Sequence, residues 1–157
     1  MSGQGHAKYA HIVIEAKTGR VLHSLNARTK NYPASLTKIM TLYMTFEALK
    51  NGSLLIHQKL PVSRVAAGRS PSKLGLRRGE RITVNNAIKA LITKSANDVA
   101  TILAEAMGGT ERKFAVMMTR RARALGMRNT TFKNASGLPN RGQLSTAEDM
   151  ATLARAV

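Results

Sequence analysis

The stretch Pro33-Ala34-Ser35-Leu36-Thr37-Lys38 stands where a turn-rich N-terminal segment gives way to a helical pattern. Apolar residues then recur at intervals of three and four as far as Leu49, which is typical of an amphipathic helix. The pair Asn51-Gly52 suits the end of that helix. We therefore predict a buried helix with Ser35 in its first turn and Lys38 one turn further along the same face.

This spacing brings a hydroxyl and an amine within reach of one another. A serine is a weak nucleophile until a base removes its proton, and a lysine desolvated by apolar neighbours has its pKa lowered enough to act as that base. The N-terminus of a helix adds free backbone N–H groups where an oxyanion would form. Taken alone, Ser-x-x-Lys also fits a surface lysine near a helix cap.

Composition and charge limit the possibilities. The chain has 157 residues, 43% of them hydrophobic, so we expect one domain, residues 1–157, with a real core. A net charge of +17 favours polyanions as partners: nucleic acid, an anionic membrane surface or an anionic wall polymer. The absence of cysteine excludes disulfides and thiolate metal sites. No stretch is apolar enough to span a membrane, and residues 1–5 do not resemble a signal peptide.

Periodicity divides the rest of the chain into a hairpin and helices. Residues 9–16 alternate like a strand, Lys17-Thr18-Gly19 supplies a turn, and residues 20–25 continue as a second strand. Residues 53–81 are rich in Gly and Pro and predict little regular structure. Helices are expected over residues 84–92 after an N-cap Thr83, and from residue 99 to a stop at Gly108-Gly109. Two more are expected over residues 110–125, with Met117 inward and the arginines outward, and from a Ser145/Glu148 capping box onward.

A second polar constellation lies in the break between two of these helices. Ser95-Ala96-Asn97 places a hydroxyl and an amide between buried segments, where polar side chains are costly unless they have a purpose. Both groups can point into one cleft, where the hydroxyl relays a proton and the amide holds Lys38 or a substrate carbonyl. The competing interpretation is that Ser95, Asn97 and Asp98 cap the helix that follows.

Taken together and in this order, the motifs resemble the serine penicillin-binding enzymes, which pair Ser-x-x-Lys with Ser-x-Asn. The closer resemblance is to the low-molecular-mass D-alanyl-D-alanine carboxypeptidases, whose nucleophile segment is similar to residues 33–41 and whose second motif is similar to residues 94–98. Three further segments add to it: residues 125–127, 132–139 and 145–150. The resemblance runs from about residue 9 to the end of the chain.

This resemblance implies a fold, a reaction and partners. The fold would be α+β, like that of the β-lactamase/transpeptidase superfamily, with a helical subdomain and an N-terminal hairpin. Ser35 would attack the bond between the terminal D-alanines of a peptidoglycan stem peptide, with Lys38 as base and Ser95 passing a proton to the leaving amine. Asn97 would orient Lys38 and bind the substrate backbone. β-Lactams would acylate Ser35, no cofactor is required, and the family works outside the cytoplasm, in the periplasm or its equivalent.

The family's third motif, Lys-Thr-Gly, follows the second motif on a strand that lines the cleft. Here the only such tripeptide is Lys17-Thr18-Gly19, which precedes Ser35 and which we interpret as a turn without catalytic function. We therefore expect a fragment, or a shortened relative with weakened chemistry, in which the later strands of the sheet are missing. The hairpin would then have an exposed edge through which a homodimer could form.

Two rival functions remain open at this point. The first is a related serine enzyme, a β-lactamase or an esterase; a class A β-lactamase would need a deacylating glutamate, and Glu148 lies in the corresponding region. The second is a non-catalytic basic binding module, although aromatic residues make up only 4% of the chain and offer few stacking platforms. A metal enzyme is not expected, because His6, His11, His23 and His57 lack ligand spacing.

Overall fold

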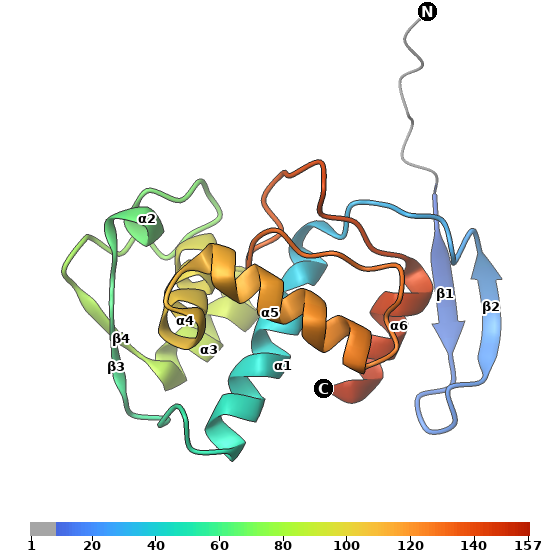
Figure 1. Cartoon of the computed structure of the whole chain (residues 1–157), viewed down its shortest axis with the longest axis horizontal. Coiled ribbons are helices and arrows are strands. Elements are labelled where there is room, and N and C mark those ends of the chain that lie inside the picture. Colours follow the sequence, from blue (N-terminus) through green and yellow to red (C-terminus); the bar gives the residue numbers. More distant parts are fainter. Residues whose placement is uncertain (1–8) are drawn as a thin grey trace, which may run out of the picture.

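The structure, a computed structural model, describes residues 9–157 and consists of a helical body with a β-hairpin beside it (Figure 1). His6 and the N-terminal residues judged unlike a signal peptide lie outside the described residues. The elements follow in this order: β1 (His11–Ile14), β2 (Val21–Leu25), the 3₁₀ turn η1 (Ala34–Leu36), α1 (Thr37–Lys50), β3 (Lys59–Pro61), α2 (Arg64–Ala67), β4 (Arg81–Thr83), α3 (Val84–Lys94), α4 (Asn97–Gly108), α5 (Glu111–Ala124) and α6 (Ala147–Ala156).

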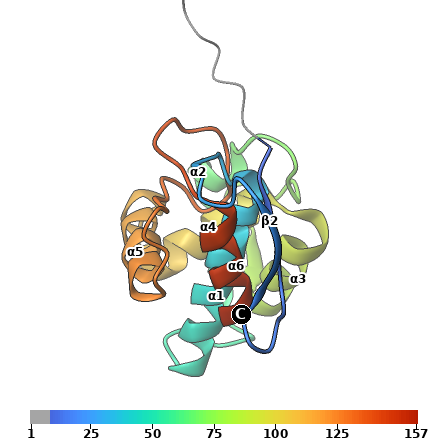
Figure 2. The ribbon, with the colours of Figure 1, turned by 90° about the vertical axis from the view of Figure 1, so that its right-hand side faces the viewer.

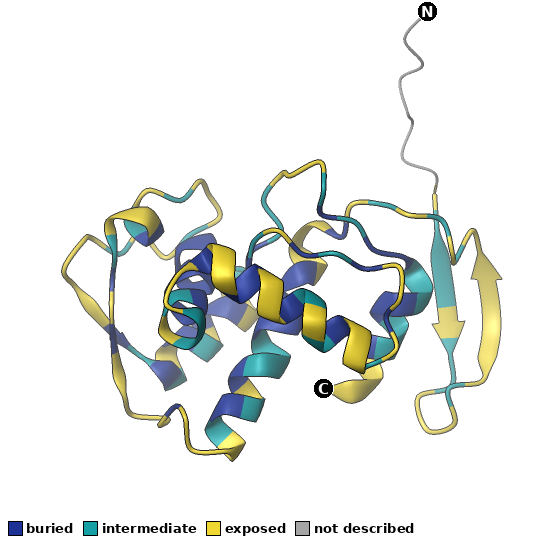
Figure 3. Ribbon diagram, in the orientation of Figure 1, coloured by how far each residue is buried: buried dark blue, intermediate teal, exposed yellow. Residues whose placement is uncertain are grey.

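The predicted hairpin is confirmed. Strands β1 and β2 pair antiparallel, with His11 opposite Leu25 and Val13 opposite His23. Ile12 and Ile14 lie on the face turned toward α6, where they line a groove, whereas Val13 on the other face is exposed. Strand β2 is exposed along its whole length, as the yellow arrow in Figure 3 shows.

The core forms around α4, which packs against α1, α3 and α5. Every residue from Asn97 to Ala104 is buried, whereas the last turn of the helix, residues 105–108, is partly exposed. Thr83 caps α3 as predicted, its hydroxyl accepting the N–H of Asn86, and α4 ends at Gly108, as predicted. Within residues 9–157, no helix combines the length and apolar character needed to cross a membrane.

The segment predicted to have little regular structure contains more than expected. Strands β3 and β4 pair antiparallel, with Leu60 opposite Ile82, and the short helix α2 packs on α4. Each strand has three residues, too few for the alternation of a strand to stand out from neighbouring Gly and Pro. Burial of Leu60, Val62 and Ile82 in the main core holds the pair in place.

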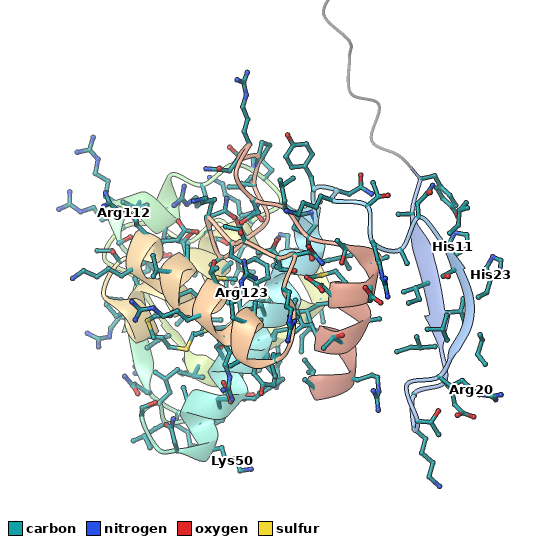
Figure 4. The ribbon with its side chains drawn as sticks, turned by 45° about the vertical axis from the view of Figure 1, so that its right-hand side comes forward. His11, Arg20, His23, Lys50, Arg112 and Arg123 are labelled. Atoms are coloured by element: carbon teal, nitrogen blue, oxygen red, sulfur yellow. The ribbon has the colours of Figure 1, made fainter. Side chains whose placement is uncertain are left out.

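Helix α5 follows the predicted pattern with two differences. Phe114 and Met118 are buried, but Met117 is 38% exposed, so its inward assignment was wrong. Arg112 and Arg123 are exposed as expected (Figure 4), and Arg123 also donates to the backbone carbonyls of Met127 and Thr130. Arg121, by contrast, is only partly exposed and pairs with Glu47 on α1.

Helix α6 begins one residue later than predicted. The hydroxyl of Thr146 accepts the N–H of Asp149 at 3.1 Å, so Thr146 is the N-cap and the expected Ser145/Glu148 capping box is wrong. Ser145 instead lies 2.8 Å from the hydroxyl of Thr130, inside the protein. Figure 2, which looks onto α6, shows the helix between α1 and the hairpin.

Candidate active site

Ser35 lies on a strained turn directly before α1. Residues Ala34–Leu36 form the 3₁₀ turn η1, so Ser35 precedes the α-helix rather than occupying its first turn as predicted. Ala34 has φ of 47°, a left-handed conformation that costs a non-glycine residue about 1–2 kcal/mol. Ser35 is exposed, and its hydroxyl is therefore open to a ligand.

Lys38 lies beneath this turn with its side chain buried. The residue is 4% exposed, and its Nζ lies 3.5 Å from the Oγ of Ser35. The ammonium donates a second, shorter hydrogen bond of 2.6 Å to the carbonyl of Ser136. Burial lowers the pKa of Lys38 to about 8, because the charged form loses its hydration. The predicted pair of Ser35 and Lys38 is therefore in place, with an amine that is partly neutral near physiological pH.

The acceptor for Lys38 belongs to a loop whose role was not predicted. The loop is fastened to α1 by Thr41, whose hydroxyl donates to the carbonyl of Ala135 at 2.8 Å. Gly137, with φ of 90°, packs so closely on η1 that a β-carbon there would overlap the carbonyl oxygen of Ala34. The sequence signal was the turn-forming run Asn134-Ala135-Ser136-Gly137, but its partner could not be identified without the fold.

Ser95 and Asn97 lie at the corner between α3 and α4, and both helices pack against α1. Ser95 has φ of 53° at the end of α3 and is partly exposed, and the described residues offer its hydroxyl no hydrogen bond. Asn97 is 6% exposed, and its Nδ2 donates to the carbonyls of Ser70 and Pro71 at 3.0 and 3.2 Å. Within residues 9–157 no hydrogen bond joins Asn97 to Lys38, and none reaches the Oδ1 of Asn97.

A buried carboxylate that sequence reasoning treated only as a cap supports this corner. Asp98 is fully buried and accepts the backbone N–H groups of Leu74, Gly75 and Leu76, as well as that of Val99. Two adjacent residues at the start of α4 thus hold the 70–76 loop: Asn97 binds its first residues, and Asp98 binds its last three.

Two other sequence features lie away from Ser35. The turn Lys17-Thr18-Gly19 contacts Arg155, at the C-terminal end of α6. Asn31, four residues before Ser35, pairs instead with Ser145, just before the N-terminal end of α6. The tripeptide thus contacts the opposite end of α6 from the end that adjoins Asn31. Glu148 forms an ion pair with Arg28 at the surface. Across the described residues no cluster of His, Asp and Glu is suited to a metal.

Comparison with known proteins covers nearly the whole chain. The family model described as D-alanyl-D-alanine carboxypeptidase, peptidase S11, matches residues 2–157. The D-alanyl-D-alanine carboxypeptidase DacF of Bacillus subtilis is 38% identical over 150 residues, which are 96% of this chain and 39% of that protein. The chain therefore spans about two fifths of the length of this relative.

Solved structures agree with this comparison. The D-alanyl-D-alanine carboxypeptidase DacD from Francisella tularensis matches with a TM-score of 0.91 and 39% identity, over 93% of this chain and 35% of that one. Penicillin-binding protein D2 from Listeria monocytogenes, in its ampicillin-bound form, matches with a TM-score of 0.83 and 33% identity, over 93% and 59% of the two chains. These similarities confirm the α+β fold class that the sequence motifs implied.

Proposed function

Because the chain belongs to the peptidase S11 family of D-alanyl-D-alanine carboxypeptidases, we propose that it carries the nucleophile and base of a serine acyl transfer acting on peptidoglycan stem peptides. The observation that carries this proposal is the buried Lys38 amine, 3.5 Å from the exposed hydroxyl of Ser35 and with its pKa lowered to about 8. No cofactor is needed for this chemistry, because the lysine itself supplies the base.

The reaction proceeds in two steps. As the Oγ of Ser35 bonds to the carbonyl carbon between the two terminal D-alanines, the neutral amine of Lys38 takes its proton. The proton then passes to the amide nitrogen, the C–N bond breaks, and D-alanine leaves while the rest of the peptide remains as an ester on Ser35. Water hydrolyses the ester and restores the serine. The N–H groups of the nucleophile turn stabilise the oxyanion.

The hydroxyl of Ser95 is the proton relay in this scheme, because it is partly exposed and has no competing hydrogen bond within residues 9–157. For Asn97 we assign the Oδ1 as the acceptor for a backbone N–H of the substrate. Its Nδ2 is already used by the carbonyls of Ser70 and Pro71, which fixes the orientation of the amide. A direct contact of Asn97 with Lys38 is not part of this assignment.

The test is intact-mass spectrometry after incubation with a penicillin, with Ser35→Ala as the control. We expect a covalent adduct of one drug mass on the parent and none on the variant. Circular dichroism of both proteins verifies that they are folded. An unmodified parent at high drug concentration contradicts the proposal, because the chain would then lack an activated nucleophile.

A second assay separates the carboxypeptidase from the related β-lactamase or esterase. Release of D-alanine from a D-alanyl-D-alanine peptide is compared with hydrolysis of the penicillin. We expect a long-lived penicillin adduct without turnover, since Glu148, in the region where a class A β-lactamase carries its deacylating glutamate, is held by Arg28 at the surface. Rapid turnover of penicillin would favour the β-lactamase instead.

Location and further partners belong to the same proposal. A stem peptide is found outside the cytoplasmic membrane, so we place the protein in the periplasm or its equivalent. The charge of +17 favours contact with an anionic wall polymer or membrane surface. The exposed strand β2 offers an open edge for pairing with a second copy, and sedimentation velocity over a range of protein concentrations tests for that dimer.

A further inference from the structure

The carboxylate of Glu111, at the start of α5, is buried and contacts two residues outside its own helix, Ala135 and Arg69. The residue is 8% exposed. Its Oε1 accepts the backbone N–H of Ala135 at 3.0 Å, and its Oε2 is paired with the guanidinium of Arg69. The hydroxyl of Thr101, on α4, lies 3.4 Å from Oε1. One carboxylate thus joins two loops that are far apart in the sequence.

The first of these loops supplies the acceptor for the base. Ala135 directly precedes Ser136, whose carbonyl takes the 2.6 Å hydrogen bond from Lys38. Glu111 holds the N–H of Ala135, and Thr41 holds its carbonyl at 2.8 Å. A shift of this short segment would move the Ser136 carbonyl, and the Lys38 amine would follow it or lose its partner.

The second loop borders the other predicted site residue. Arg69 adjoins Ser70, whose carbonyl accepts the Nδ2 of Asn97. Arg69 also donates from Nε to the hydroxyl of Thr101 at 2.9 Å, so its guanidinium is fixed at two points. Within residues 9–157, Arg69 is the only charged side chain that contacts Glu111.

We propose that Glu111 is a positioning residue, which holds the Ser136 carbonyl against Lys38 and the Ser70 carbonyl against Asn97 without touching substrate itself. Hydrogen bonds to an ionised carboxylate are about twice as strong as those between neutral groups, which suits this anchor to two irregular loops. The inference rests on the proposed function for its effect on rate, but its effect on Lys38 can be measured without any reaction.

The experiment compares Glu111→Gln with Glu47→Gln in the full chain. Glu47 pairs with Arg121 between α1 and α5, so its variant also loses a Glu–Arg ion pair, although a more exposed one, and leaves both loops anchored. The titration midpoint of Lys38 is read from its 13Cε signal in lysine-labelled protein and assigned with Lys38→Ala. The rate of acylation by a penicillin and the melting temperature are measured beside it.

We expect Glu111→Gln to lower the melting temperature more than Glu47→Gln, because Glu111 is the more deeply buried partner. Only Glu111→Gln lowers the midpoint of Lys38, by about 0.5 unit or more, because the ammonium is held less well by the Ser136 carbonyl. The same variant slows acylation about tenfold or more, since misplacement of a reacting group is costly. If Glu111→Ala folds, we expect it to lower the Lys38 midpoint further, because alanine offers no acceptor for the N–H of Ala135.

A Lys38 midpoint in Glu111→Gln that equals or exceeds that of Glu47→Gln would overturn the inference, and Glu111 would then serve stability alone. If the parent itself is not acylated, the proposed function fails, but the Lys38 titration still decides whether Glu111 positions the base.

Discussion

Lys38 is the base in the proposed reaction, and its burial lowers its pKa and so sets the pH at which it can accept a proton. An amine accepts a proton only in its neutral form, which predominates above its pKa, here lowered to about 8. The hydroxyl of Ser35 is within its reach at 3.5 Å. The rate should therefore depend on pH near neutrality, where an ordinary surface lysine remains fully charged.

We predict that the rate of acylation of Ser35 by a penicillin rises with pH and reaches half its maximum near pH 8. The measurement is the appearance of the adduct by mass at pH values from 6 to about 10. Lys38→Arg, which stays charged throughout this range, should show almost no adduct at any pH. A parent profile that does not rise across this window would assign the base to another group.

Gly137 must be a glycine because its backbone packs directly against that of Ala34. It has φ of 90°, and a β-carbon at this position would overlap the backbone of Ala34, the residue that precedes the nucleophile. Gly126 provides the matched comparison, because it has φ of 89° and nothing lies within 4 Å of its would-be β-carbon.

Gly137→Ala should therefore destabilise the protein more than Gly126→Ala and slow acylation as well. Gly126→Ala should cost about 1–2 kcal/mol, from the left-handed backbone alone, with no effect on acylation. Chemical denaturation gives the free energies of unfolding, and mass spectrometry gives the rates. Equal costs in the two variants would mean that the 134–138 loop moves away from η1 without penalty.

At the scale of the elements, the corner between α3 and α4 depends on a side chain at the start of the second helix. Asp98 accepts four backbone N–H groups, three of them from the loop at residues 74–76. A buried N–H group that loses its acceptor lowers the stability of the fold, because no water molecule takes the acceptor's place. At residues 74–76 the irregular loop is therefore held mainly by one carboxylate, with Leu76 packed against the core.

We expect Asp98→Asn to lower the free energy of unfolding by about 2–4 kcal/mol, since an amide replaces a charged acceptor and leaves one or more N–H groups unpaired. Hydrogen exchange should accelerate at residues 74–76 before it does so elsewhere. Glu105→Gln is the control, because this carboxylate, also on α4, accepts a single hydrogen bond from the described part of the chain, that of the Ser63 hydroxyl. Protection at 74–76 that matches the parent would show that another contact holds the loop.

At the scale of the whole molecule, the positive charge exceeds what internal pairing can neutralise. The chain carries 25 Lys and Arg residues against 8 Asp and Glu, for a net charge of +17. Part of the available acid is already committed within the fold, to Arg28, Arg69 and Arg121. Most of the cationic side chains therefore remain to attract external anions, and the attraction should fall steeply with salt.

We predict that the protein binds polyanions without regard to sequence and loses at least about tenfold in affinity between 50 and 200 mM salt. Fluorescence anisotropy with two labelled DNA duplexes of unrelated sequence measures this, the DNA serving as a generic polyanion. The acylation rate at saturating penicillin, measured at the same two salt concentrations, should change little, because the proton passes from Ser35 to Lys38 over a short distance. Binding that prefers one duplex or ignores salt would favour the basic binding module as a specific function.

Local pattern was sufficient for a large part of the fold. Helix α1, its end before Asn51-Gly52, the cap of α3 at Thr83 and the hairpin all follow from contacts between residues near in sequence, such as periodic burial, capping and turns. The pair of Ser35 and Lys38 belongs to this class, because three residues span one helical turn. One error, the cap of α6, fell where neighbouring residues compete for the same role, here Ser145 and Thr146.

The sequence by itself thus determined which residues we propose as nucleophile and base, the second motif, and most of the helices that carry them. Only the tertiary structure decided what surrounds them: the Ser136 carbonyl on Lys38, the strained Ala34 beneath Gly137, and the Glu111 carboxylate that ties two loops together. The physical reason is separation along the chain. Ser136 lies 98 residues from Lys38, and no local preference specifies such a partner; burial and hydrogen bonding across the folded core do.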